Sequence, residues 1–161
     1  MAKSTNINNR RYLGNKYKLL PFIKKVVDSE CTDIEIVVDI FSGTGAVASA
    51  FQDKQLITND IMYSNYISNL AWFSPRKYSR KKIEKIIDEY NAMITNEENY
   101  MTINFSNTYF SHDDCSKIGF IREDIEIKYA NKEINKRERA LLITSLLYAM
   151  DKIAKTCGHY D

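Results

Sequence analysis

Proline, cysteine and histidine are scarce in this chain of 161 residues, which contains two, three and two of them respectively. Cys31, Cys115 and Cys157 are an odd number at wide spacings, whereas a disulfide framework needs paired cysteines. With no Cys-x-x-Cys pair and only two histidines, the sequence gives no sign of a zinc site. We therefore expect three reduced cysteines and no bound metal.

Long apolar runs are absent as well. No stretch reaches the roughly 18 apolar residues that a membrane-spanning helix needs, and residues 1–18 lack the apolar segment of a secretory signal peptide. We therefore expect a cytoplasmic protein with no membrane partner. Hydrophobic residues make up 44% of the chain and charged residues 27%, a composition typical of a folded globular domain.

Neither sign of charge dominates, since the formal net charge is only +2. The basic residues are nevertheless clustered, and aromatic residues accompany two of the three clusters. The clusters are Arg10, Arg11, Lys16 and Lys18 with Tyr12 and Tyr17; Arg76, Lys77, Arg80, Lys81 and Lys82 with Trp72, Phe73 and Tyr78; and Lys132, Lys136, Arg137 and Arg139. Lys and Arg pair with phosphates and aromatic rings stack on bases, so this pattern favours a nucleic-acid partner. A solvated helix face is the alternative for any one cluster.

The first part of the chain alternates between helical and strand patterns. Apolar spacing predicts a helix over 17–28, with Pro21 tolerated in its first turn. Residues 34–41 are β-branched and almost continuously apolar, which predicts a strand buried on both faces of a parallel sheet. After glycines at 43 and 45, a short helix over 46–51 and a second strand over 55–59 follow.

The rest of the chain has a mainly helical pattern. Periodic apolar residues predict helices over 63–73, 79–95, 113–130 and 136–156, with breaks at Ser74-Pro75 and at a polar stretch over 96–99. Sheets usually have about five or six strands, and parallel ones are covered by helices on both faces, whereas this sequence offers two convincing strands. We therefore predict an α/β fold with an incomplete sheet and a large helical portion.

The strongest motif is DIFSGTG, from Asp39 to Gly45. Two glycines separated by one residue allow a tight turn and bring the backbone close to a ligand, at a place where helix N–H groups are also expected. Asp60 ends the second predicted strand, where an acidic residue of a nucleotide-binding fold accepts hydrogen bonds from ribose hydroxyls. The alternative role for Asp60 is a helix N-cap.

A third motif lies ahead of the first helix, where Gly14 permits an unusual backbone angle and Lys16 can meet an anionic group. The three motifs, in this order, resemble the amino-terminal half of the Dam-like D12 class of N6 adenine-specific DNA methyltransferases. They read Tyr12-x-Gly14-x-Lys16, Asp39-x-Phe41-x-Gly43-x-Gly45 and Asn59-Asp60. Phe105 to Ile125 and Glu138 to Asp161 are similar to segments of restriction-associated members, so the resemblance covers nearly the whole chain.

The resemblance implies a Rossmann-like core that binds S-adenosyl-L-methionine. Its members transfer the methyl group to the exocyclic N6 of an adenine flipped out of double-stranded DNA. By this resemblance, residues 1–62 form the cofactor-binding part and residues 63–161 its helical continuation. The cofactor would be held by Tyr12, Gly14, Lys16, Asp39, Phe41, Gly43, Gly45, Asp60 and Ile61.

The catalytic motif of this family is absent. It consists of Asp, Asn or Ser followed by two prolines and an aromatic residue, whereas Pro21 and Pro75 of this chain are not adjacent. We therefore expect no catalytic residue here, no methyl transfer by this chain alone, and a carboxyl-terminal portion or complementary chain that completes the enzyme. An incomplete core also favours a homo-oligomer.

Two other hypotheses stay open from the residues. The glycine motif alone would also suit a methyltransferase acting on RNA or protein. Alternatively, the chain is a small helical nucleic-acid-binding or regulatory protein, in which DIFSGTG is only a strand-to-helix turn. Binding of S-adenosyl-L-homocysteine would separate both methyltransferase hypotheses from the last one.

Overall fold

The computed structural model describes residues 16–154. The chain divides into two compact units at Pro75 and Arg76, beside the Ser74-Pro75 break. The first unit therefore extends beyond the 62/63 boundary suggested by the resemblance and includes the helix that follows it. Tyr12, Gly14 and Cys157 lie outside the described residues.

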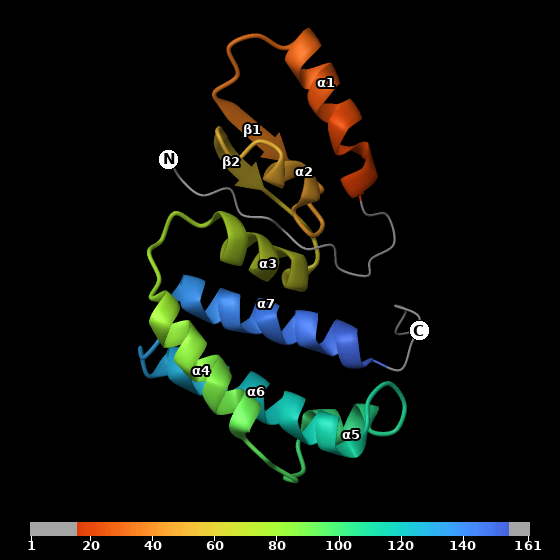
Figure 1. Cartoon of the computed structure of the whole chain (residues 1–161), viewed down its shortest axis with the longest axis vertical. Coiled ribbons are helices and arrows are strands. Elements are labelled where there is room, and N and C mark those ends of the chain that lie inside the picture. Colours follow the sequence, from red (N-terminus) through yellow and green to blue (C-terminus); the bar gives the residue numbers. More distant parts are fainter. Residues whose placement is uncertain (1–15, 155–161) are drawn as a thin grey trace. The chain divides into compact units, whose positions relative to one another are not determined.

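The first unit is built around two short parallel strands (Figure 1). Its elements are the 3-10 turn η1 (Lys16–Leu19), α1 (Leu20–Glu30), β1 (Ile36–Asp39), the single-turn helix α2 (Ala46–Ser49), β2 (Gln55–Thr58) and α3 (Tyr63–Phe73). Ile36 pairs with Gln55 and Asp39 with Thr58. Both strands therefore end at the same edge of the sheet, which is where ligands bind in parallel α/β folds.

The sheet of the first unit is only partly covered. Within residues 16–154 it has two strands, and Ile36, Val38 and Ile57 are 49%, 55% and 48% exposed. The prediction that the first strand is buried on both faces is therefore wrong, because this short sheet leaves alternate residues of each strand exposed and the others only half-buried. In the part of this unit that the structure describes, residues 16–75, the buried apolar side chains are Ala46, Ala48, Phe51, Ile67 and Ala71.

The second unit is helical in its described part (Figure 1). It consists of α4 (Arg80–Ala92), α5 (Tyr100–Phe105), α6 (His112–Ala130) and α7 (Lys136–Ile153). Sequence periodicity predicts α3 at its observed bounds and places α4, α6 and α7 within a few residues of theirs. It misses α5, which lies just after the polar stretch that was interpreted as a break.

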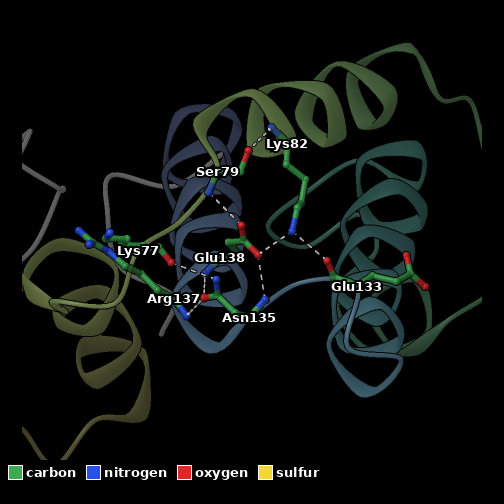
Figure 2. Close-up of polar contacts among 7 residues, drawn as sticks. All are labelled: Lys77, Ser79, Lys82, Glu133, Asn135, Arg137 and Glu138. Atoms are coloured by element: carbon green, nitrogen blue, oxygen red, sulfur yellow. Dashed lines mark hydrogen bonds and ion pairs between the residues drawn. The ribbon is translucent and has the colours of Figure 1, made fainter.

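A buried carboxylate joins the starts of α4 and α7 (Figure 2). Glu138, whose side chain is 3% exposed, accepts hydrogen bonds from Ser79 N at 3.0 Å, Asn135 N at 2.9 Å and Lys82 Nζ at 3.1 Å. Burial acts to raise the pKa of Glu138, but these donors outweigh it and hold the pKa below its ordinary value. Asn135 Nδ2 also donates to the Lys77 carbonyl at 3.1 Å, so the two helix starts are held together.

Asn99 links α5 to α6. Its side chain accepts from Met101 N and Thr102 N at the start of α5, and its Nδ2 donates to the Ser116 carbonyl of α6 at 2.9 Å. The same amide lies over Gly119, where a Cβ atom would overlap it. Gly119 is therefore a packing requirement inside α6.

We predict that Gly119→Ala destabilises the protein. Alanine in a helix interior normally gains about 1 kcal/mol over glycine, but here the added methyl group displaces the Asn99 amide, and overpacking costs about 1–3 kcal/mol. Denaturant unfolding monitored by circular dichroism measures the difference. In an Asn99→Ser background, which keeps a helix cap and removes the amide, Gly119→Ala should be neutral or stabilising. An equal cost in both backgrounds would contradict the contact.

Candidate ligand site at the carboxyl ends of the strands

The turn that follows β1 is held by Asn59, which directly follows β2, and by a side chain from α3. Ser42 donates to the Asn59 carbonyl through both its backbone N (2.9 Å) and its Oγ (3.0 Å), and Asn59 Nδ2 donates to the Ile40 carbonyl at 3.0 Å. From α3, Asn69 Nδ2 donates to Ser42 Oγ and to the Gly43 carbonyl, each at 3.0 Å. The glycine turn is therefore fixed before any ligand arrives.

Asp60 connects this turn to the start of α3. Its Oδ2 accepts from Gly43 N at 2.8 Å, and its Oδ1 accepts from Met62 N at 2.9 Å and Asn65 Nδ2 at 3.0 Å. Burial acts to raise the pKa of Asp60, but the bonds from Asn65, Met62 and Gly43 together lower it below its ordinary 3.8. The carboxylate is thus ionised at neutral pH and keeps one lone-pair site for a further donor.

The N-cap alternative for Asp60 differs from the observed arrangement. Met62 is the N-cap of α3, and no side chain caps it. Asp60 supports the helix from two residues earlier, through the Met62 N–H, while it also binds Gly43. Asp60 therefore supports the start of α3, and it also holds the glycine turn that follows β1.

The two glycines of the turn have different surroundings. Gly45 has a φ of +85°, and a Cβ there would lie 2.7 Å from Asn69 Oδ1 and 2.9 Å from the Phe73 ring. Gly43 has a φ of +51°, and nothing lies within 4 Å of where its Cβ would be. Gly45 is thus required by packing on α3, whereas Gly43 leaves open space beside the backbone.

Asp39 places a second carboxylate at the end of β1. Its Oδ2 is buried and has no hydrogen-bond partner in the described part of the chain. Burial raises the pKa of Asp39, and the positive charge of Lys16 and hydrogen bonds from the backbone of Ala48 and Phe41 to the carboxylate oppose this shift. Lys16 Nζ also donates to the Phe41 carbonyl at 3.4 Å. An unpartnered buried carboxylate oxygen is costly, which makes Asp39 a candidate to receive a donor from a ligand.

The structure brings most of the predicted site residues to one edge of the sheet. Lys16, Asp39, Gly43, Gly45 and Asp60 surround the turn, and Phe41 and Ile61 beside it are 78% and 100% exposed. Sequence reasoning missed Asn65 and Asn69, which are buried although polar. Their i, i+4 spacing puts them on one helix face, and this spacing, directly after Asp60, was the available signal.

The arrangement offers binding groups rather than a reacting set. Among the described residues, hydrogen-bond acceptors, the cation of Lys16 and exposed apolar side chains meet here, and no nucleophile is held by a base. Within residues 16–154, no group of three or more His, Cys, Asp or Glu side chains is placed to hold a metal ion. No helix in the same range is long and apolar enough to cross a membrane.

A strand, a glycine turn, a second parallel strand and an acidic residue at its end are the arrangement that nucleotide-binding units of α/β proteins have in common. The model of one family, the D12 class N6 adenine-specific DNA methyltransferases, matches residues 12–161. The chain therefore belongs to this family, and the resemblance seen in its motifs is confirmed. Members of the family use S-adenosyl-L-methionine and act on DNA.

Several restriction-modification methyltransferases are similar to this chain. Modification methylase LlaI of Lactococcus lactis subsp. lactis is 30% identical over 94% of the chain, and Type II methyltransferase M.FokI of Planomicrobium okeanokoites is 31% identical over 93%. M.NlaIII of Neisseria lactamica is 28% identical over 92%. The chain spans 26% of the first two relatives and 47% of the third. No solved structure matches it significantly.

We predict that Asp60→Asn lowers stability and removes part of its pH dependence. The amide keeps an acceptor for Met62 N but turns a donor toward Gly43 N, so one charged hydrogen bond is lost, at about 1–3 kcal/mol. The pKa of Asp60 in the folded protein is below its ordinary value. The ionised carboxylate therefore adds to the free energy of unfolding at pH values above the unfolded pKa, and this stabilisation is lost as pH falls through the folded pKa.

Thermal unfolding of both proteins between about pH 7 and pH 2.5 measures this effect. The difference in Tm between the parent and Asp60→Asn should be largest near neutral pH and should disappear in acid. Asp28→Asn, which removes an exposed carboxylate from α1, serves as the matched control and should leave the profile unchanged. A gap between Asp60→Asn and the parent that stays constant down to the lowest pH would contradict the role of the charged carboxylate.

Proposed function

We propose that this chain is the cofactor-binding portion of an adenine-specific DNA methyltransferase of a restriction-modification system. In this proposal its first unit is part of a Rossmann-like core in the cytoplasm. The core holds S-adenosyl-L-methionine, whose methyl group goes to N6 of an adenine in double-stranded DNA. Membership of the D12 family supports this function over a role on RNA or protein and over a purely helical binding protein.

The observation that carries the proposal is the pairing of two features at one end of the sheet. One is the open space at Gly43, where a ligand can approach the backbone. The other is the buried Oδ2 of Asp39, which lacks a partner in the described part of the chain. Together they fit a ligand that brings both a hydrogen-bond donor and a flat or bulky group to the turn.

S-adenosyl-L-methionine has groups that suit these residues. Its ammonium group would donate to Asp39, and a ribose hydroxyl would use the remaining lone-pair site of Asp60. Lys16 carries the positive charge that the methionine carboxylate requires, and the exposed side chain of Ile61 offers apolar contact to the adenine ring. Tyr12 and Gly14 are assigned to this site by the family motif alone.

Catalysis requires a further segment or a complementary chain. Methyl transfer to adenine needs a group that orients and polarises the N6 amine, and the Pro-Pro tetrapeptide that does so in this family does not occur in the sequence. The exposed strand residues Ile36, Val38 and Ile57 provide an apolar surface that additional structure, or a second copy of the chain, would cover.

We predict that S-adenosyl-L-homocysteine binds the chain and that the two glycines of the turn respond differently. Gly43→Asn fills the open space with a residue that tolerates positive φ, so it should fold and bind the ligand at least about tenfold more weakly, a loss of about 1.4 kcal/mol. Gly45→Ala should instead lower the Tm because its Cβ meets Asn69 and Phe73. Isothermal titration calorimetry and thermal melts provide the two measurements. A folded Gly43→Asn variant with the affinity of the parent would place the site elsewhere.

We also predict that binding and methyl transfer are separable. With tritiated S-adenosyl-L-methionine and unmethylated genomic DNA, the 161-residue chain should transfer no label above background. Addition of a carboxyl-terminal polypeptide encoded at the same locus, containing the Pro-Pro motif, should restore transfer. Robust labelling by the chain alone would show that it contains an active site that the motif analysis has misplaced.

A further inference from the structure

Asn65 and Asn69 lie on the face of α3 that contacts the glycine turn. They are 2% and 4% exposed, and their i, i+4 spacing places them about one turn apart on the helix. A buried asparagine is uncommon, because its amide must find hydrogen-bond partners inside the protein. Both amides have such partners in the described part of the chain, and these partners belong to the candidate ligand site.

A closed ring of hydrogen bonds joins α3 to the carboxyl end of the sheet. Gly43 N donates to Asp60 Oδ2 at 2.8 Å, and the Gly43 carbonyl accepts from Asn69 Nδ2 at 3.0 Å. Asn69 Nδ2 also donates to the Asn65 carbonyl at 2.9 Å, and Asn65 Nδ2 donates to Asp60 Oδ1 at 3.0 Å. Asp60 is therefore tied to the glycine turn twice, once directly and once by way of α3.

The ring gives the two oxygens of Asp60 different numbers of donors. Oδ1 accepts from Met62 N at 2.9 Å and from Asn65 Nδ2 at 3.0 Å, which uses both of its lone pairs. Oδ2 accepts from Gly43 N alone among the described residues, so it keeps one lone pair. The acceptor left for a ligand is therefore Oδ2, which is bonded to Gly43, where the space beside the backbone is open.

Asn65 is the side chain that fixes this difference between the oxygens. The other two donors, Met62 N and Gly43 N, are backbone groups set by the path of the chain. Without the Asn65 amide, Oδ1 would also have a vacant lone pair, and the carboxylate could turn either oxygen toward a ligand. Burial acts to raise the pKa of Asp60, and the hydrogen bond from Asn65 is the largest of the influences that lower it.

We propose that Asn65 is a positioning residue for the cofactor, which orients the Asp60 carboxylate so that Oδ2 receives a ribose hydroxyl. The inference rests on the proposed function, in which the cofactor binds at this turn, and it adds a residue that touches Asp60 rather than the ligand. A hydroxyl that meets a carboxylate already held in place avoids the entropy cost of ordering that side chain on binding. The effect of Asn65 is therefore confined to the ribose hydroxyls.

Calorimetry with S-adenosyl-L-homocysteine and with its dideoxy analogue, which lacks both ribose hydroxyls, tests this role on the full chain. Asn65→Leu keeps a side chain of similar size and removes the donor to Asp60. The variant should bind S-adenosyl-L-homocysteine about tenfold more weakly than the parent, whereas its affinity for the dideoxy analogue should change by less than about twofold. A general loosening of α3 would weaken the binding of both ligands by the same factor.

Ser68→Ala is the matched control, because Ser68 is a buried polar residue of α3 whose hydroxyl donates to the Ser64 carbonyl within the helix. It should leave the ratio of the two affinities at the value of the parent. Asn65→Ser is a second test variant, whose shorter side chain does not reach Asp60, and it should change the ratio in the same direction as Asn65→Leu. Thermal melts check that each variant is folded.

A double-mutant cycle with Asp60→Ala shows whether Asn65 acts through Asp60. In the Asp60→Ala background, Asn65→Leu should have no further effect on the affinity for S-adenosyl-L-homocysteine. A ratio of affinities that the Asn65 variants leave unchanged, or additive effects in the cycle, would overturn the inference and leave cofactor binding in place. Absence of S-adenosyl-L-homocysteine binding by the parent would instead overturn the proposed function, and the inference with it.

Discussion

The hydrogen bond from Gly43 N to the carboxylate of Asp60, at 2.8 Å, is the contact on which the first unit depends. It joins the turn after β1 to the residue that ends β2, and the same carboxylate holds the start of α3 through Met62 N and Asn65 Nδ2. Two parallel strands of four residues each have few hydrogen bonds of their own. The side-chain contacts at their shared edge therefore fix the turn in a shape that leaves Gly43 open.

The second unit uses the same physical device with a different result. Glu138 also accepts from backbone N–H groups of two separate segments, at Ser79 and Asn135, and its pKa is lowered as that of Asp60 is. In the first unit the arrangement leaves acceptor capacity for a ligand with donors. In the second unit it consumes the carboxylate and joins the starts of α4 and α7.

Long periodic helices and the glycine motif were predictable because their signals are local. The bounds of α3 follow from apolar spacing and the break at Ser74-Pro75, and Asp60 follows from its place after a strand. The i, i+4 spacing marks Asn65 and Asn69 as a pair on one helix face, but it does not give their partners. Asn69 contacts the glycine turn 26 positions away, and Glu138 contacts Ser79 59 positions away, so these contacts could not be predicted from local signals. The short helix α5 was missed because its stability comes from the Asn99 cap and packing on α6 rather than from a periodic pattern.

The central claim is that a cofactor of the methyltransferase family binds at the turn after β1. Labelling the chain with ¹⁵N-glycine gives five amide signals, one for each glycine, and Gly43 and Gly45 report directly on the turn. On titration with S-adenosyl-L-homocysteine, their two signals should shift while that of Gly119 in α6 stays in place. A shift of Gly119 without Gly43 and Gly45, or ligand binding with both turn signals unmoved, would contradict the account.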